Sequence, residues 1–324
     1  MIYKKALITG ANGFIGRTIA RRLQAEGIEV VGVDSHTGGQ PGMIAGDIAT
    51  PGTWQDAFSG CDLVIHTAAV VSNAVDAETT WRVNVLGTRH VVDAAIKAGV
   101  TRLIHLSSVR AFSDVNFPDG VDEQWPVRTD GNAYVDTKIA SEHVALQAHA
   151  AGELAVTIIR PGDVYGPGSR PWVVLPIEAM KSGSFALPAD GKGIFSPVYV
   201  DDLIDGLLLA ARHPKAAGQI FTLSGPETCT TSEYFGYLHR MLGRSGSPKT
   251  VPTSLALGAA AVVAFVARLR GVDTEINPTT IRYLARTGGY SSKKAEQLIN
   301  YRPSVSLEQG MHRTGVWLRS EGLL

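Results

Sequence analysis

Tyr134 and Lys138 stand four positions apart in a segment whose pattern predicts a helix, so both side chains lie on one helix face. A nearby ammonium favours the phenolate and lowers the pKa of the tyrosine toward neutrality, which suits the phenol to donate or accept a proton at an alcohol or carbonyl oxygen. Ser107 and Ser108 follow a short apolar run at residues 103–106, where a serine hydroxyl could hold the reacting oxygen. Because a Tyr and a Lys at this spacing are common, their meaning depends on the segments before them.

Three glycines, Gly10, Gly13 and Gly16, lie between the apolar run at residues 6–8 and an amphipathic stretch at residues 14–25. At such a strand-to-helix turn, the first glycine permits the tight turn, the second lets the backbone approach a pyrophosphate, and the third lets the helix pack close to the sheet. The helix N-terminus adds free N–H groups and the positive end of a dipole. The spacing therefore predicts a dinucleotide-phosphate site.

Asp34 follows the next apolar run, residues 28–33, at about the distance from the glycines where dinucleotide-binding proteins place an acid. A carboxylate there accepts hydrogen bonds from both ribose hydroxyls and repels a 2′-phosphate, which favours NAD over NADP. The alternative is a turn residue at the end of a strand.

Short apolar runs rich in β-branched residues alternate with longer amphipathic stretches, and this alternation predicts a doubly wound, Rossmann-type α/β fold with a parallel sheet. The predicted strands lie at residues 6–8, 28–33, 63–65, 103–106 and 156–159. One predicted helix covers residues 14–25, and another carries an apolar stripe made by Trp81, Val85, Thr88, Val92 and Ala95.

After Arg160 the rhythm breaks into Pro- and Gly-rich pieces, which predicts a smaller, discontinuous second domain. We expect residues 1–162 to form the NAD-binding domain, with residues 194–224 returning to it through strands at 198–200 and 220–223. Residues 163–193 and 225–324 then form the substrate-binding domain.

The composition excludes several classes of protein. Among 324 residues, 30 Lys plus Arg balance 30 Asp plus Glu, so no overall field attracts nucleic acid or anionic lipid. Two cysteines and no export signal favour a cytoplasmic protein. Residues 255–267 are uncharged but too few to span a membrane, and we expect a buried helix or a pocket wall rather than a membrane-surface helix. No metal-ligand spacing occurs, so no metal is expected.

Together, these motifs resemble those of the extended short-chain dehydrogenase/reductases, also called the NAD-dependent epimerase/dehydratase family. The resemblance rests on residues 9–16, the Ser107-Ser108 pair, Tyr134 with Lys138, residues 160–168 and residues 198–202. It continues into a closing helix and turn at residues 290–303, where Asn300 replaces the family's glycine. The resemblance implies an enzyme that uses NAD, takes a small-molecule substrate and forms a homodimer through helices near residues 81–95 and 134–150.

Position by position, the resemblance implies three catalytic residues: Tyr134 as the acid/base, Lys138 as its partner and Ser108 on the substrate oxygen. The positions implied to contact NAD are Gly10, Asn12, Gly13, Phe14, Ile15, Gly16, Asp34, Asp47, Ile48, Thr67, Ala68, Ala69, Asn84, Ser107, Tyr134, Lys138, Pro161 and Gly162. The alternative for Asn84 is a polar position on a packed helix. Two departures concern substrate geometry: the segment after Ser108 lacks the family's Tyr-Gly ending, and Asp136 is an unusual charge.

Phe195 stands where enzymes of the family that act on nucleotide sugars commonly place an arginine for the diphosphate. The segment around it looks more like the 3β-hydroxysteroid dehydrogenase branch, which implies a secondary alcohol or ketone on a hydrophobic, sterol-like or long-chain substrate. Because Lys192 or Arg282 could still contact a phosphate, a nucleotide-sugar 4-epimerase or dehydratase is the alternative. A non-catalytic cofactor sensor is a third hypothesis, against which the intact Tyr, Lys and Ser set argues.

Overall fold

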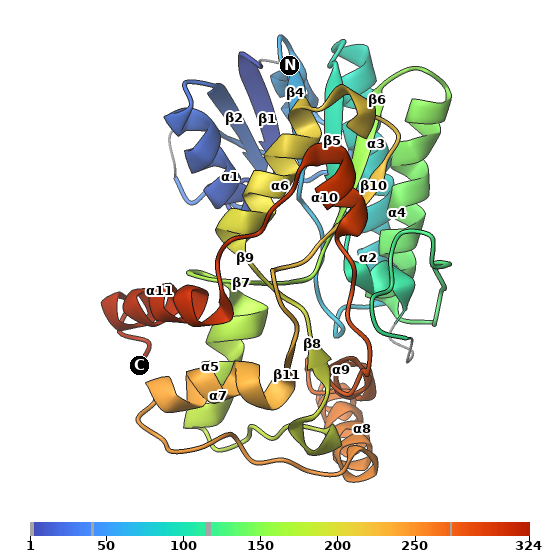
Figure 1. The fold of residues 1–324 in the computed structure, drawn as a ribbon. Helices are drawn as coiled ribbons and strands as arrows, with labels where there is room; N and C mark the ends of the chain where they lie inside the picture. Colours follow the sequence, from blue (N-terminus) through green and yellow to red (C-terminus); the bar gives the residue numbers. More distant parts are fainter. Residues whose placement is uncertain (1–2, 40–41, 114–117, 273) are drawn as a thin grey trace.

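The computed structural model describes residues 3–39, 42–113, 118–272 and 274–324 (Figure 1). Its centre is a parallel sheet of seven strands in the order β10-β6-β5-β4-β1-β2-β3. The strands are β1 (Lys5–Thr9), β2 (Glu29–Asp34), β3 (Met43–Ala45), β4 (Leu63–His66), β5 (Arg102–Leu106), β6 (Ala155–Pro161) and β10 (Ile220–Leu223). All five predicted strands are present. Every residue of β4 and β5 is buried, which explains why these runs are continuous rather than alternating.

Helices cover both faces of this sheet, as a Rossmann-type fold requires (Figure 1). One face packs against α1 (Phe14–Ala25), α6 (Val200–Arg212) and α10 (Lys293–Ile299), and the other against α2 (Ala77–Trp81), α3 (Gly87–Lys97) and α4 (Ala133–Ala150). Two separate hydrophobic cores result, one on each side of the sheet. The predicted fold class is confirmed.

The predicted apolar stripe before β5 is correct except at its first member. Val85, Thr88, Val92 and Ala95 are buried, but Trp81 is 47% exposed. A π-helical turn, Arg82–Leu86, separates α2 from α3 and changes the helical phase, so Trp81 no longer shares the buried face.

A second layer lies below the sheet in Figure 1. It contains the strand pairs β7 (Asp163–Tyr165) with β9 (Pro197–Tyr199) and β8 (Ile194–Phe195) with β11 (Cys229–Thr230). Its helices are α5 (Leu175–Lys181), α7 (Thr231–Met241), α8 (Thr253–Leu269), α9 (Pro278–Leu284) and α11 (Leu307–Ser320).

One expected return to the main sheet is wrong. The segment at 220–223 joins the sheet as β10, but the segment at 198–200 pairs with β7 instead. At Gly162 the two segments approach closely, and a Cβ atom there would lie 2.6 Å from the carbonyl oxygen of Ser196. This contact brings the chain before β9 against the end of β6, and β9 then continues beside β7.

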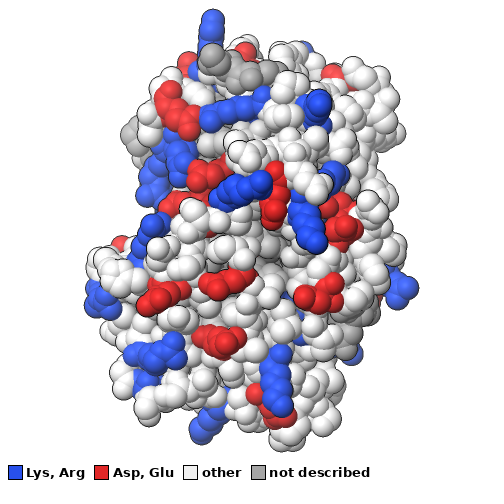
Figure 2. Space-filling view, viewed as in Figure 1, with Lys and Arg blue, Asp and Glu red and all other residues white. Residues whose placement is uncertain are grey.

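The uncharged segment at 255–267 lies within α8, but the expectation of a buried helix or pocket wall is wrong. Only Ala256 and Ala260 are buried in α8, whereas Leu255, Val262 and Phe265 are each more than 60% exposed. No helix among the described residues is long and apolar enough to cross a membrane. On the face drawn in Figure 2, Lys and Arg side chains are interspersed with Asp and Glu, as the balanced composition predicts.

Asn300 ends α10 in the left-handed conformation, with φ 57° and ψ 36°. Glycine is the usual residue for this position, and asparagine tolerates it better than most others. The replacement of the family's glycine by Asn300 is therefore compatible with the same turn.

Candidate active site

A cleft of about 860 Å³ lies between the carboxyl ends of the sheet strands and the second layer. The strand order reverses between β1 and β4, and ligands of open parallel sheets bind at such a point. The cleft is lined by nearly all residues predicted to contact NAD or to act in catalysis: Gly10, Gly13, Phe14, Ile15, Gly16, Asp34, Asp47, Ile48, Thr67, Ala68, Ala69, Ser107, Ser108, Tyr134, Lys138, Pro161 and Gly162. Asn12 and Asn84 are the two exceptions.

The glycine turn before α1 has the shape that a dinucleotide phosphate needs. Gly10 has φ +70°, and a Cβ atom there would lie 2.7 Å from the backbone nitrogen of Ala68. A Cβ atom on Gly16 would lie 2.2 Å from the carbonyl oxygen of Gly10, so only glycine allows this close packing. α1 begins without a side-chain cap and without an acidic residue in its first turn, which leaves its N-terminus to an anion. These residues fit the pyrophosphate of NAD.

Asp34 lies in the cleft at the end of β2, where it accepts hydrogen bonds from the backbone N–H groups of Asn12 and His36, each at 3.0 Å. The carboxylate is thus held in place by the turn, and it lines the part of the cleft beside the glycines. Asn12 lies outside the lining and donates its side-chain amide to the carbonyl oxygen of His36. This bond supports the loop that carries Asp34, and the contact of Asn12 with NAD stays a prediction.

Asn84 is buried beneath the loop that follows β4. Its side chain accepts a hydrogen bond from the backbone N–H of Val70 at 2.8 Å and donates to the carbonyl oxygen of Val70 and to Oγ1 of Thr137 at 3.1 Å. Asn84 is therefore engaged within the protein, where it fixes the backbone next to Ala68 and Ala69, and its contact with NAD stays a prediction.

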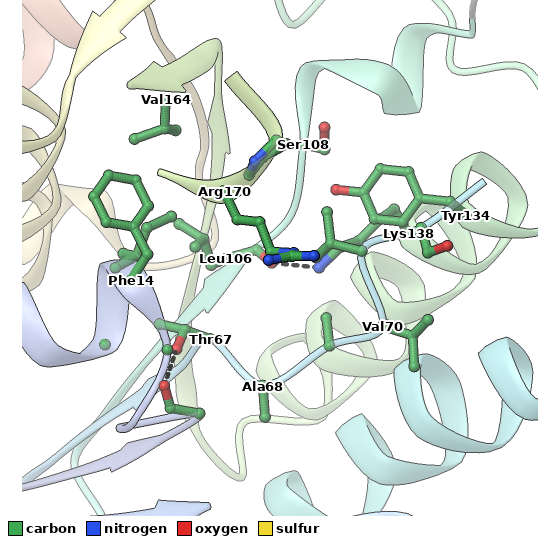
Figure 3. Close-up of a pocket in the computed structure, with 18 of the residues that line it drawn as sticks. Phe14, Thr67, Ala68, Val70, Leu106, Ser108, Tyr134, Lys138, Val164 and Arg170 are labelled. Carbon is green, nitrogen blue, oxygen red and sulfur yellow. Dashed lines mark hydrogen bonds between the residues drawn. The ribbon is translucent and has the colours of Figure 1, made fainter. Parts of the chain in front are cut away.

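Tyr134, Lys138 and Ser108 come together on one side of the cleft (Figure 3). α4 places Tyr134 and Lys138 one turn apart, and the side chain of Asn132 caps that helix by accepting from the N–H of Val135 at 3.0 Å. Lys138 Nζ donates to the carbonyl oxygen of Leu106 at 2.8 Å. Ser108 Oγ accepts from the N–H of Arg110 at 3.1 Å, so the serine proton can be donated to a substrate oxygen.

Burial lowers the pKa of Lys138 from 10.5 to about 8, and the negative charge of Glu142 partly opposes the shift. The ammonium lies 6.0 Å from the centre of the Tyr134 ring. A lysine with this pKa is charged at neutral pH and titrates in mildly alkaline solution, which links the state of the site to pH.

Ser107 is anchored away from the reacting position. Its hydroxyl donates to Glu142 Oε1 at 2.5 Å. Glu142 also forms a buried two-point ion pair with Arg160, at 2.8 and 2.6 Å. This cluster connects β5, α4 and β6 below the cleft and holds Ser108 in position next to its neighbour.

Two arginines of the site were not predicted from the sequence, because neither belongs to a motif with a known role. The Arg110 guanidinium lies over the rings of Tyr134, at 5.2 Å, and Tyr283, at 4.9 Å, and donates to Asn73 Oδ1 at 2.8 Å. Its only signal in the sequence is that it falls in the segment that departs from the family pattern. Arg170 also lines the cleft and had no signal beyond its place in a Pro- and Gly-rich stretch.

A buried ion pair between Asp163 and Arg286 holds together the part of the second layer that borders the cleft. The same carboxylate accepts from the Tyr283 hydroxyl at 2.6 Å and from the backbone N–H of Ser196 at 2.9 Å. β7, α9 and the segment before β9 are therefore joined at one acid.

Phe195 lies outside the cleft lining, fully buried against Trp172 and Tyr234, with ring centres 4.9 and 4.3 Å away. Lys192 and Arg282 do not line the cleft either. Neither of the two cations considered for a phosphate is therefore placed to contact a ligand there.

His66 and His105 are packed histidines. His66 hydrogen-bonds Thr9 and Thr88, and burial lowers its pKa to about 3, so it is neutral. Within the described ranges, no group of His, Cys, Asp and Glu side chains could hold a metal ion.

Comparison with known proteins agrees with this geometry. A model of the NAD dependent epimerase/dehydratase family matches residues 6–224. The chain is 30% identical over 272 residues to 3beta-hydroxysteroid-dehydrogenase/decarboxylase isoform 1 of Arabidopsis thaliana, covering 79% of this chain and 62% of that protein's length. It is 30% identical over 329 residues to 2-alkyl-3-oxoalkanoate reductase of Stenotrophomonas maltophilia, covering 95% and 98%.

Among solved structures, dTDP-glucose 4,6-dehydratase DesIV from Streptomyces venezuelae, with NAD and TYD bound, is 26% identical. It superimposes with a TM-score of 0.79 over 99% of this chain and 100% of its own. By the family match over residues 6–224, the chain belongs to the NAD dependent epimerase/dehydratase family, the extended short-chain dehydrogenase/reductases, and is an NAD-dependent enzyme.

Proposed function

We propose that this enzyme interconverts a secondary alcohol and a ketone on a hydrophobic substrate, sterol-like or long-chain. The observation that carries the proposal is the placement of Tyr134, Lys138 and Ser108 in a cleft that also has a wall of apolar side chains. That wall contains Val164, Pro171, Trp172, Leu175 and Tyr283. The names of the two relatives above, a hydroxysteroid dehydrogenase/decarboxylase and an alkyl-oxoalkanoate reductase, support a hydrophobic ketone or alcohol.

In the proposed mechanism, the Ser108 hydroxyl donates a hydrogen bond to the substrate oxygen and orients it toward Tyr134. The Tyr134 hydroxyl exchanges a proton with that oxygen as it changes between alcohol and carbonyl. Lys138 stabilises the phenolate by its charge, and Arg110 adds a second positive charge against the same ring. NAD, when bound, supplies the hydride chemistry.

For the cofactor, we propose that the backbone at Gly10, Gly13 and Gly16 binds the pyrophosphate. Asp34 would accept hydrogen bonds from the adenine ribose. Thr67, Ala68 and Ala69 would border the middle of the molecule, and Pro161 and Gly162 the nicotinamide. Residues 1–162 with 200–224, which contain α6 and β10, would then be the NAD-binding part, and residues 163–199 and 225–324 would bind the substrate.

A nucleotide-sugar 4-epimerase or dehydratase is the second candidate. The similarity to DesIV favours it. Against it, Phe195 is buried among aromatic side chains where a phosphate-binding arginine would stand, and Lys192 and Arg282 lie outside the cleft. A cofactor sensor is a third candidate. Because a non-catalytic protein needs no acid/base pair, the position of Tyr134 and Lys138 in the cleft argues against it.

The deciding experiment follows nicotinamide absorbance with sterols, long-chain hydroxy acids and UDP-sugars side by side. Tyr134→Phe should lower turnover by about 10²- to 10⁴-fold while NAD still binds, because only the acid/base is removed. Tyr237→Phe, a tyrosine that does not line the cleft, is the matched control and should keep full activity. Unchanged turnover in Tyr134→Phe would refute the mechanism. Conversion of a UDP-sugar without a net change in nicotinamide absorbance, measured by chromatography of the sugar products, would favour the second candidate.

The homodimer and the cytoplasmic location stay predictions. The half-exposed side chains of Trp81 and Leu86, both on the α2–α3 surface beside α4, support pairing of two subunits there.

A further inference from the structure

Arg170 is a cation of the cleft that the proposed mechanism does not use. It follows Ser169 at the start of a π-helical turn, Arg170–Val174, that leads into α5. Figure 3 shows its side chain reaching into the cleft, on the side that carries Tyr134 and Lys138. Throughout the part of the chain that the structure describes, its guanidinium has no hydrogen bond and no ion pair.

The other charged groups around the substrate part of the cleft are engaged within the protein. Arg110 donates to Asn73, and Lys138 donates to the carbonyl oxygen of Leu106. Asp163 is paired with Arg286, and Glu275 accepts from Ser72 Oγ and from the N–H of Asn73. Among the described cations that line the cleft, Arg170 is therefore the one with no partner in the protein.

The backbone on either side of Arg170 is fixed. Ser169 is fully buried and donates to the carbonyl oxygen of Val164 at 3.0 Å. Trp172 stacks on Tyr283 with ring centres 5.9 Å apart and packs its edge against Phe195. A flexible, solvent-exposed side chain thus projects from a rigid base into the cleft that holds Tyr134 and Lys138, where its guanidinium is accessible to a ligand.

We propose that Arg170 binds a carboxylate of the substrate, so that the substrate class is a hydrophobic hydroxy acid and the corresponding oxo acid. This inference rests on the proposed function. The planar fork of a guanidinium matches a carboxylate with two parallel hydrogen bonds. Because Arg170 reaches toward Tyr134, the carboxylate belongs close to the carbon that carries the reacting oxygen.

One available cation suits one carboxylate better than a diphosphate. A nucleotide diphosphate carries its charge at a distance from the reacting sugar carbon and needs several donors. The cleft wall around Arg170 is apolar at Val164, Pro171 and Leu175. Such a wall accommodates the alkyl part of a hydroxy acid whose carboxylate pairs with Arg170.

The test compares three substrates of equal chain length: a long-chain 3-hydroxyalkanoate, its methyl ester, and an alkan-2-ol without the carboxyl group. Arg170→Met should lower kcat/KM for the acid by about 10- to 100-fold, as expected for a lost charged hydrogen bond. The ester and the alkanol should change by less than about twofold, since they never used it. Arg170→Lys should recover part of the loss, and Arg319→Met on α11 should change nothing.

A binding assay separates the subsite from turnover. Dodecanoate is titrated into the NAD-bound enzyme while tryptophan fluorescence is followed, since Trp172 lines the cleft. Arg170→Met should weaken dodecanoate binding by at least about tenfold and leave the Kd for NAD unchanged. If no alcohol or acid is oxidised by the wild type, the proposed function fails, but weaker dodecanoate binding in Arg170→Met would still support the subsite.

Four results would overturn the proposal. Equal loss with acid, ester and alkanol would make Arg170 a structural residue. A weaker Kd for NAD would assign it to the cofactor. Unchanged dodecanoate binding in Arg170→Met would leave the carboxylate elsewhere. Loss of UDP-sugar binding in the same variant, with the acid unaffected, would assign its partner as a diphosphate.

Discussion

Replacing Lys138 by methionine should stabilise the apoprotein at pH 7 while ending its activity. The lysine is almost fully buried, and burial is the main cause that lowers its pKa from 10.5 to about 8. Methionine keeps the length and packing of the stem and removes the charge. A group that we propose to act in catalysis thus lowers the stability of the fold, as happens at other active sites.

The size of the effect follows from the pKa. The difference between 10.5 and about 8 corresponds to about 3 kcal/mol that the folded protein loses by keeping the ammonium charged at pH 7. The variant also loses the hydrogen bond from Nζ to the carbonyl oxygen of Leu106, worth about 1–2 kcal/mol. The net expectation is an increase of about 1–2 kcal/mol in the free energy of unfolding.

The sign of the pH dependence is fixed by the same pKa. Because the folded-state pKa of Lys138 is lower than that of the unfolded chain, the unfolded state binds more protons between pH 8 and 10.5. The penalty is fully present below about pH 8 and disappears as the pH rises toward 10.5. Between pH 7 and pH 9.5, the advantage of Lys138→Met should therefore fall by about 2 kcal/mol.

Urea denaturation of both proteins without NAD, at several pH values from 7 to 9.5, measures this difference directly. Other titrating groups cancel because they are common to the two proteins. Lys181→Met on the exposed end of α5 is the control and should show a difference that does not change with pH. A Lys138→Met variant that is less stable at pH 7, or whose difference from the wild type is constant with pH, would refute the reasoning.

Three further predictions concern the frame of the site. Asp34→Ala should shift cofactor preference toward NADP by about tenfold in a titration, since the carboxylate that repels a 2′-phosphate is lost; an unchanged preference would count against its role. Asp163→Asn should lower the free energy of unfolding by about 3–5 kcal/mol in urea, because it leaves Arg286 buried and unpaired, and a loss below about 1 kcal/mol would contradict this. Gly16→Ala should cost about 1–3 kcal/mol and weaken NAD binding in calorimetry, because its Cβ atom would lie 2.2 Å from the oxygen of Gly10; normal NAD affinity would show that α1 adjusts freely.

The strands and the glycine turn were predictable because their causes are local. A strand buried on both faces must be apolar throughout, so β4 and β5 stand out in the sequence without knowledge of their partners. The turn at Gly10 needs a positive φ and a close approach, and glycine is the residue that provides both. These signals also predict the end of the sheet at which ligands bind.

α8 shows where composition is insufficient. Its apolar residues predict burial, yet only Ala256 and Ala260 are covered by the rest of the chain. Which face of a helix is covered depends on the neighbours that the fold brings to it, and α8 packs mainly against α9. The same limit applies to Trp81, whose exposure follows from a π-helical turn that periodicity does not reveal.

The charged residues of the site also differ in how far they could be predicted from the sequence. Lys138 was predictable because it shares a helix with Tyr134, and the spacing alone brings the two together. Arg110 reaches the same ring from the segment after β5, through a contact 24 positions away in the sequence that no local period encodes. Two cations therefore lie near one phenol ring, and the motif identifies one of them. The departure of the segment after Ser108 from the family pattern thus has a physical meaning: it places Arg110, a second positive charge, against Tyr134.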